Sequence, residues 1–168
     1  MNRTRELTVS APSDREIVLS RDFDAPAALV FDALTRPELL TRWFGARGWN
    51  LVVCEVDLQV GGAWRFVSRG PDDAEMAHGG TYRVIDRPHR LVYTELYDEQ
   101  SYPGETLISH ELVERDTATA LTTTVLYATP EGRDRVLKYP MARGVGESFD
   151  RLATVLADVR MESRGDAS

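Results

Sequence analysis

The sequence has little cysteine and little histidine, and both shortages exclude kinds of chemistry. Its single cysteine, Cys54, excludes an internal disulfide and a cysteine-based metal cluster. Cys54 lies in a strand-like segment without an evident activating group, so we expect an inert thiol. The three histidines, His78, His89 and His110, lack a metal-ligand spacing such as HExxH. No glycine-rich loop has a phosphate-binding pattern. We therefore expect neither a metal nor a cofactor.

Basic residues are also in the minority. Lys and Arg number 20 against 27 Asp and Glu, which gives a formal net charge of −7. Such a charge argues against nucleic acid as a partner, because phosphates require a basic surface. No apolar run is long enough for a signal peptide or a membrane span. We expect a cytoplasmic protein whose partner is neutral, apolar or basic.

The 168 residues suit one domain with a substantial core. We assign residues 15–160 to that domain, 1–14 to a flexible N-terminal segment and 161–168 to a flexible tail. Helix-start signals with proline at Asp24 and Thr35 predict two short helices. Apolar steps of three or four residues predict a long last helix over 141–159. Alternation predicts strands over residues 16–23, 49–56, 63–68, 78–85, 91–97, 106–113 and 119–127.

This order of elements predicts an α+β fold. Short connections between strands indicate an antiparallel meander, here a curved sheet of about seven strands wrapped on the long C-terminal helix. Two short helices follow the first strand. One helix about 10 Å across does not fill the concavity of such a sheet. Either large side chains fill the remaining space, or a cavity stays open.

Seven short segments carry a resemblance to a known family. They are DAPAALVF, LTRWFG, VGGAWRF, GTYRVI, RLVYTE, LTTTVLY and ESFDRL, in that order over residues 16–158. The pattern resembles the helix-grip fold of the START/SRPBCC superfamily, which includes lipid-transfer domains and the birch-pollen allergen. It is most similar to the bacterial AHSA-type branch, named after activators of the ninety-kilodalton heat-shock protein's ATPase. The resemblance implies the fold. The family includes ligand carriers, polyketide cyclases, stress-linked proteins and many members with no assigned role, so the fold does not fix the function.

The aromatic residues supply candidate walls for a cavity. Trp64 and Phe66 alternate with Arg65 and therefore share one face of a strand. We expect that face to point inward, with Arg65 and Arg83 in solvent. Gly144 and Gly146 would bend the last helix or leave room beneath it. The candidate lining residues are Trp43, Phe44, Trp64, Phe66, His78, Tyr82, Tyr93, Glu95, His110, Met141, Val145 and Phe149.

Glu95 and His110 are the candidates for chemistry. Glu95 shares a face with Leu91, Tyr93 and Tyr97, so it points into the concavity in one register and into solvent in the other. A carboxylate among apolar groups is costly unless it is paired. His110 is either a core histidine held by a hydrogen bond or a ligand-binding or catalytic group. The two lie on successive strands and could be neighbours. For His78, the sequence leaves a surface position and a site position open.

Three hypotheses for function follow. The first is a binding module that encloses a small, largely apolar or aromatic molecule. The second is a cyclase- or hydrolase-like enzyme that uses Glu95 and His110 in the same cavity. The third is a chaperone-accessory domain, which the resemblance suggests. The sequence favours binding over catalysis, and it leaves a homodimer and a chaperone contact open.

Overall fold

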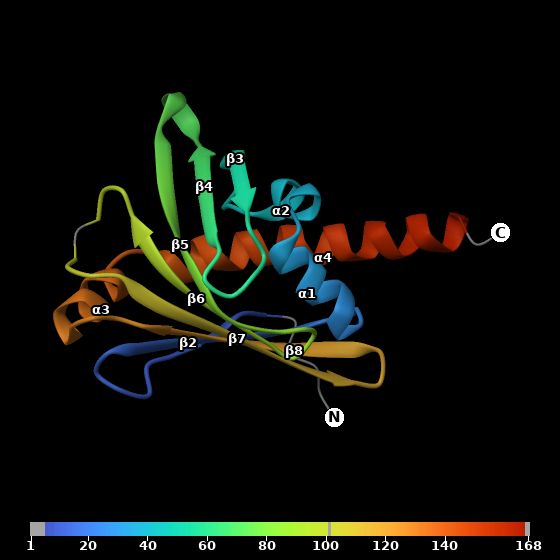
Figure 1. The fold of residues 1–168 in the computed structure, drawn as a ribbon, viewed down its shortest axis with the longest axis horizontal. Helices are drawn as coiled ribbons and strands as arrows, with labels where there is room; N and C mark the ends of the chain where they lie inside the picture. Colours follow the sequence, from blue (N-terminus) through green and yellow to red (C-terminus); the bar gives the residue numbers. More distant parts are fainter. Residues whose placement is uncertain (1–5, 101, 167–168) are drawn as a thin grey trace.

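A computed structural model describes residues 6–100 and 102–166 of the chain. Eight antiparallel strands form one sheet, and four α-helices and a short 3-10 helix complete the fold (Figure 1). The elements in chain order are β1 (Thr8–Ser10), β2 (Glu16–Phe23), α1 (Ala27–Thr35), α2 (Pro37–Trp43), β3 (Asn50–Val56), β4 (Ala63–Arg69), η1 (Pro71–Asp73), β5 (Glu75–Asp86), β6 (Arg90–Tyr97), β7 (Thr106–Arg115), β8 (Ala118–Leu126), α3 (Pro130–Leu137) and α4 (Met141–Asp166).

The sheet has the order β1-β2-β8-β7-β6-β5-β4-β3. Strands β3 to β8 form a meander. The last strand, β8, pairs on its other side with β2, near the start of the chain. The predicted α+β helix-grip fold is confirmed. Register shifts between Leu51 and Val53 in β3, and between Tyr82 and Val84 in β5, interrupt the ladders. Such irregularities bend strands and increase their twist, which suits a sheet that curves.

The ends of the domain differ from the sequence-based expectation. Residues 8–10 lie in the segment predicted to be flexible, but they form β1, which makes eight strands rather than about seven. The Thr8 and Ser20 hydroxyls are 2.5 Å apart across this pair. At the other end, α4 continues past the predicted end at Val159 to Asp166. The predicted flexible residues 1–5 and 167–168 lie outside the described residues.

The start of α1 also differs from the prediction. Asp24 was expected to cap the helix, but the helix begins at Ala27 with Pro26 at the cap position. The Ala27 N–H donates to Glu114 Oε1 of β7 at 2.6 Å. A carboxylate there satisfies a backbone donor that the first turn leaves open and lies at the positive end of the helix dipole. A residue distant in sequence thus does what a local cap was expected to do.

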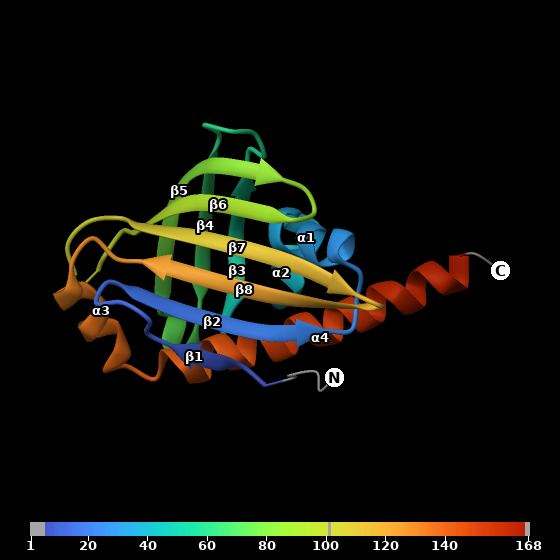
Figure 2. The same ribbon diagram turned by 90° about the horizontal axis from the view of Figure 1, so that it is seen from below.

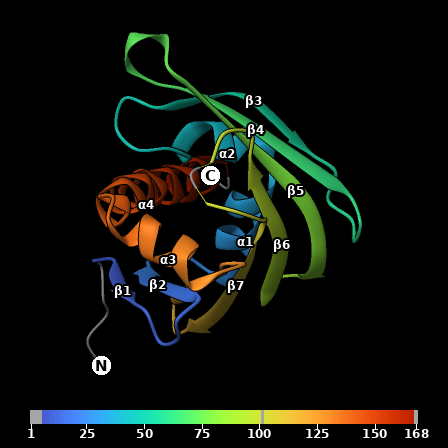
Figure 3. The ribbon, with the colours of Figure 1, turned by 90° about the vertical axis from the view of Figure 1, so that its left-hand side faces the viewer.

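Helix α4 crosses the concave face of the sheet (Figure 3). Phe149, Leu152 and Leu156 are buried in the main core cluster, and Val145 packs against it partly buried. These are the residues predicted to make this contact. The C-terminal turns of α4 extend beyond the sheet (Figure 2). The N-terminal half of α4, next to the curved strands, therefore contributes most of its contact with the concavity.

Candidate functional site

A cavity of about 330 Å³ lies between the inner face of strands β4–β7 and helices α2 and α4. Its volume is near the lower end of the range of about 300–1,000 Å³ that is typical of small-molecule sites. All the residues predicted to line a cavity do line this one: Trp43, Phe44, Trp64, Phe66, His78, Tyr82, Tyr93, Glu95, His110, Met141, Val145 and Phe149. The side chains of Trp64, Phe66 and Tyr82 are buried, as expected for the inner face.

Several lining residues were missed by the sequence analysis. Tyr97 follows Glu95 by two positions in β6, so strand alternation was a usable signal for it. Trp49 was predicted to begin a strand, but β3 begins at Asn50 and Trp49 lies in the connection from α2, so strand alternation does not decide its direction. The other missed residues are Leu34, Leu40, Gly45, Ala46, Ser68, Met76, Gly144 and Ser148. For Gly144 the sequence carried a partial signal, because a residue without a side chain was expected to bend the last helix or to leave room beneath it.

The connection between α2 and β3, residues 44–49, forms one rim of the cavity and is tied to α4. Arg151 NH1 donates to the carbonyl oxygens of Gly45 and Trp49, at 3.0 and 2.7 Å. The Gly45 N–H donates to Ser148 Oγ at 3.0 Å. These bonds occupy backbone groups that would otherwise lack partners. They fix the rim, and with it Trp49, relative to the helix.

His78 lies at the centre of the aromatic wall. It is 2% exposed, so the buried position is correct and the surface alternative is wrong. In the sheet it faces Phe66 of β4 on one side and Tyr97 of β6 on the other. Its ring stacks on that of Tyr97 with centroids 4.6 Å apart and planes within 9°, and it also stacks on Phe44 at 5.7 Å. Trp64 and Phe66 meet it edge-to-face.

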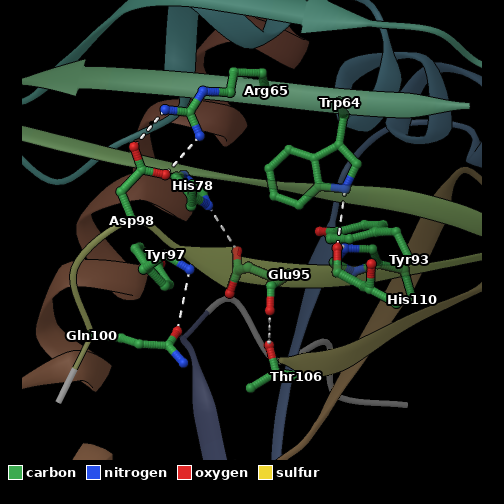
Figure 4. Close-up of polar contacts among 11 residues, drawn as sticks. Trp64, Arg65, His78, Tyr93, Glu95, Tyr97, Asp98, Gln100, Thr106 and His110 are labelled. Atoms are coloured by element: carbon green, nitrogen blue, oxygen red, sulfur yellow. Dashed lines mark hydrogen bonds and ion pairs between the residues drawn. The ribbon is translucent and has the colours of Figure 1, made fainter. Parts of the chain in front are cut away.

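Glu95 points into the cavity and pairs with His78 rather than with His110. His78 Nδ1 and Glu95 Oε2 are 2.9 Å apart, and the Glu95 side chain is 14% exposed (Figure 4). The register explains the correction, because Glu95 lies opposite Thr106, whereas His110 lies opposite Leu91. Four residues along a strand separate the two positions by about 13 Å. His78, opposite Tyr97, is instead a diagonal neighbour of Glu95.

His110 is held in a hydrogen-bonded network of its own. Its Nε2 lies 2.8 Å from the Tyr93 hydroxyl and its Nδ1 lies 2.8 Å from Thr123 Oγ1. Burial lowers the pKa of His110 from 6.5 to about 4, because a charged imidazolium is disfavoured away from water. The ring is therefore neutral at pH 7. This matches the alternative of a core histidine satisfied by hydrogen bonds, although the residue also lines the cavity.

Tyrosine hydroxyls and the indole of Trp64 are among the other polar groups of the wall, which also include the hydroxyls of Ser68 and Ser148. Burial, followed by the nearby charge of Glu95, raises the pKa of Tyr93. For Tyr97 the charge of Glu95 comes first and burial second, and both raise its pKa. These hydroxyls keep their protons at neutral pH. The Trp64 Nε1–H donates to the Thr94 carbonyl oxygen at 3.1 Å, so this buried donor is satisfied (Figure 4).

The outer face of the sheet behaves as predicted. Arg65, between Trp64 and Phe66, makes two bonds of 2.7 and 2.6 Å to the Asp98 carboxylate (Figure 4). This exposed pair lowers the pKa of Asp98 through the hydrogen bonds. Arg83 is also exposed. Both arginines thus lie outside the cavity.

Cys54 is half-buried, and burial followed by the charge of Glu38 raises its thiol pKa to about 11.

Two further observations concern the described part of the chain. No three His, Cys, Asp or Glu side chains among residues 6–100 and 102–166 are grouped so that they could hold a metal ion. No helix within the same residues has both the length and the apolar composition needed to cross a membrane.

The fold and the cavity define a class of protein: a helix-grip domain of the START/SRPBCC superfamily with an internal site. Residues 24–157 match the family model described as "Activator of Hsp90 ATPase homolog 1-like protein". The match covers most of the chain, and the chain belongs to this family. No curated protein matches the chain.

Solved structures of proteins from other organisms have a similar fold. A Rhodobacter sphaeroides protein is 36% identical, with a TM-score of 0.86 over 91% of this chain and 99% of that one. The AHSA1 protein of Silicibacter pomeroyi is 18% identical, with a TM-score of 0.69 over 84% and 97% of the two chains. A Plasmodium falciparum protein described as an HSP90 activator is 22% identical, with a TM-score of 0.52 over 67% and 72%. The last two show the fold alone.

Proposed function

We propose that this protein binds a small, largely apolar molecule in the cavity between the curved sheet and α4. The observation that carries the proposal is a cavity of about 330 Å³ whose wall is built from aromatic rings with only a few polar groups. This composition is typical of small-molecule sites, in which apolar walls supply affinity and a few polar groups fix orientation. The predicted lining residues would then be the ligand-binding residues.

Several polar side chains of the cavity wall form two separate sets. The His78–Glu95 pair and the Tyr97 ring lie together, whereas Tyr93 and His110 bond to each other. A ligand with one polar end and an apolar body suits this distribution. The polar end would meet the His78–Glu95 pair, and the body would contact the rings of Trp64 and Phe149.

The same pair favours the enzymatic alternative. A carboxylate beside an imidazole fixes the orientation of the ring and supports a role as a general base. A cyclase- or hydrolase-like reaction would therefore use Glu95 with His78, and not with His110. The comparison is direct: if a co-purifying molecule is converted by the wild type but not by the Glu95→Gln variant, the protein is an enzyme.

A chaperone-accessory role has a different basis. It depends on the description of the family and on the similarity in fold to the Plasmodium falciparum HSP90 activator. The cavity, by contrast, is a feature of this chain's own residues, so ligand binding is the better-supported proposal. A cytoplasmic location and a homodimer remain predictions.

Intrinsic fluorescence tests the proposal, because all three tryptophans, Trp43, Trp49 and Trp64, line the cavity. The probe is N-phenyl-1-naphthylamine, which is neutral at pH 7.5 and fluoresces in apolar surroundings. We expect saturable binding with a matching loss of tryptophan emission. Native mass spectrometry of protein purified from its own host would identify a retained natural ligand.

A matched pair of variants locates the probe. Gly144 lines the cavity, whereas Gly146 does not, and an added Cβ at Gly146 has no atom within 4 Å. Gly144→Leu should therefore abolish binding, and Gly146→Leu should preserve it, with both folds checked by circular dichroism. Equal binding by the two variants, or no binding by the wild type, would contradict the proposal.

A further inference from the structure

The charge of the cavity wall restricts what it accepts. Among the described residues that line the cavity, none is Arg or Lys, and Glu95 is the only acidic one. With a neutral His78 the wall carries one negative charge, and with a protonated His78 it carries none. In neither state is the wall net positive. An anionic group such as a carboxylate therefore finds no charge to compensate the loss of its hydration.

The Glu95 carboxylate has an unused acceptor. Its Oε2 is paired with His78, whereas Oε1 makes no hydrogen bond to another described residue and is not fully buried. The side chain is largely removed from water, at 14% exposure. A partly buried carboxylate oxygen that a ligand can reach is stabilised by a hydrogen-bond donor, and most strongly by a charged one. The effect of its charge on the hydroxyls of Tyr93 and Tyr97 indicates that it is felt along the wall.

The surroundings of the pair also suit a cation. The rings of Tyr97, Trp64, Phe66 and Phe44 lie with centroids 4.6–5.7 Å from that of His78. The faces of aromatic rings attract cations, and tryptophan and tyrosine do so best. Through its 2.9 Å contact with His78, the Glu95 carboxylate lies next to this group of rings, and a carboxylate beside aromatic rings combines the two interactions that recognise an organic ammonium group.

From this geometry we infer that the cavity selects a protonated amine on an apolar body, with its ammonium group against Glu95 and its body against the aromatic wall. The inference rests on the proposed function and names the class of molecule that the site takes. It distinguishes this cavity from one that holds an organic anion with an arginine or lysine in the wall.

Displacement of N-phenyl-1-naphthylamine by three compounds of nearly equal size tests the inference at pH 7.5. They are 2-phenylethylamine, which is cationic, 2-phenylethanol, which is neutral, and phenylacetate, which is anionic. We expect the amine to displace the probe at the lowest concentration and phenylacetate to be the weakest. Loss of one charge-assisted hydrogen bond should weaken amine binding to the Glu95→Gln variant by about 10- to 100-fold, measured relative to the affinity of the same variant for the probe.

Glu111→Gln is the matched control. Glu111 is exposed in β7, and its substitution makes the same change in the net charge of −7 without touching the cavity. This variant should keep the full preference for the amine. Equal or better displacement by phenylacetate, or an amine preference that survives in Glu95→Gln, would overturn the inference and leave the binding function intact. Failure of the probe itself to bind the wild type would overturn both.

Discussion

The burial of His110 makes stability depend on pH in a way that can be measured. Its pKa is about 4 in the folded protein and returns to about 6.5 in the unfolded chain. Above pH 6.5 both states are neutral at this residue. Between pH 6.5 and 4, His110 binds a proton in the unfolded chain but stays neutral in the folded protein. The contribution of neutral His110 to stability is therefore complete above pH 6.5 and is lost as the pH falls towards 4.

The magnitude follows from the two pKa values. A difference of one pKa unit corresponds to about 1.4 kcal/mol, so the wild type should lose about 3 kcal/mol between pH 7 and pH 4 through this residue. His110→Gln removes the titrating group. It also disturbs the bonds to Tyr93 and Thr123, each 2.8 Å long, which should cost about 1–2 kcal/mol at pH 7. The variant is thus less stable at pH 7 and more stable at pH 4.

Urea unfolding followed by circular dichroism at pH 7, 6, 5 and 4 measures this crossing. Taking the difference between wild type and variant cancels acid effects that are common to both proteins. His89→Gln is the control, because His89 is exposed in the turn between β5 and β6. Its curve should stay parallel to that of the wild type. A constant gap between wild type and His110→Gln would show that His110 is not desolvated, and the reasoning would be refuted.

Three further predictions concern stability and reactivity. Phe149→Ala should destabilise the protein by about 3–5 kcal/mol in urea unfolding, because the ring is 6% exposed and packs edge-to-face on Phe23; a loss below about 1 kcal/mol would contradict this packing. Gly80→Ala should destabilise it by at least about 2 kcal/mol in the same assay, because a Cβ there overlaps the Thr94 carbonyl oxygen; unchanged stability would show that the strands are not so close. Cys54, with a pKa of about 11, should react with a disulfide reagent at pH 8 far more slowly than free cysteine, and an equal rate would show an exposed thiolate.

Much of the fold could be predicted because its strands carry a strong local signal. The predicted strand over 16–23 coincides with β2, and the others agree with β3–β8 to within a few residues. The strand β1 was missed for a physical reason. Thr8–Ser10 is short and exposed on every residue, so it has no buried face to create alternation. Its hydrogen bonds to β2 define it, and those depend on a partner outside the segment.

The sequence predicted many of the residues that line the cavity, but it did not predict which of them contact each other. Alternation along a strand decides which residues face inward, so the lining residues could be named. Which of them touch depends on the register between strands. The positions of Glu95 and His110 on successive strands left a contact between them open, but the ladder sets them four positions apart and brings His78 to Glu95 instead. A register shift beside Tyr82 is a feature of the paired strands that one segment alone does not reveal.

The presence of Glu95 in the wall is itself an argument that the cavity has a use. A closed core would be served better by an apolar residue at this position, since replacing a buried ion pair with hydrophobic residues is often neutral or stabilising. Here the carboxylate is desolvated, its partner is one imidazole, and one of its oxygens has no partner among the described residues. Around it, rings that could have filled the concavity meet edge-to-face and leave about 330 Å³ open. The cavity and the Glu95 carboxylate lie at the same place. A ligand with a hydrogen-bond donor on an apolar body would fill the cavity and donate to the carboxylate.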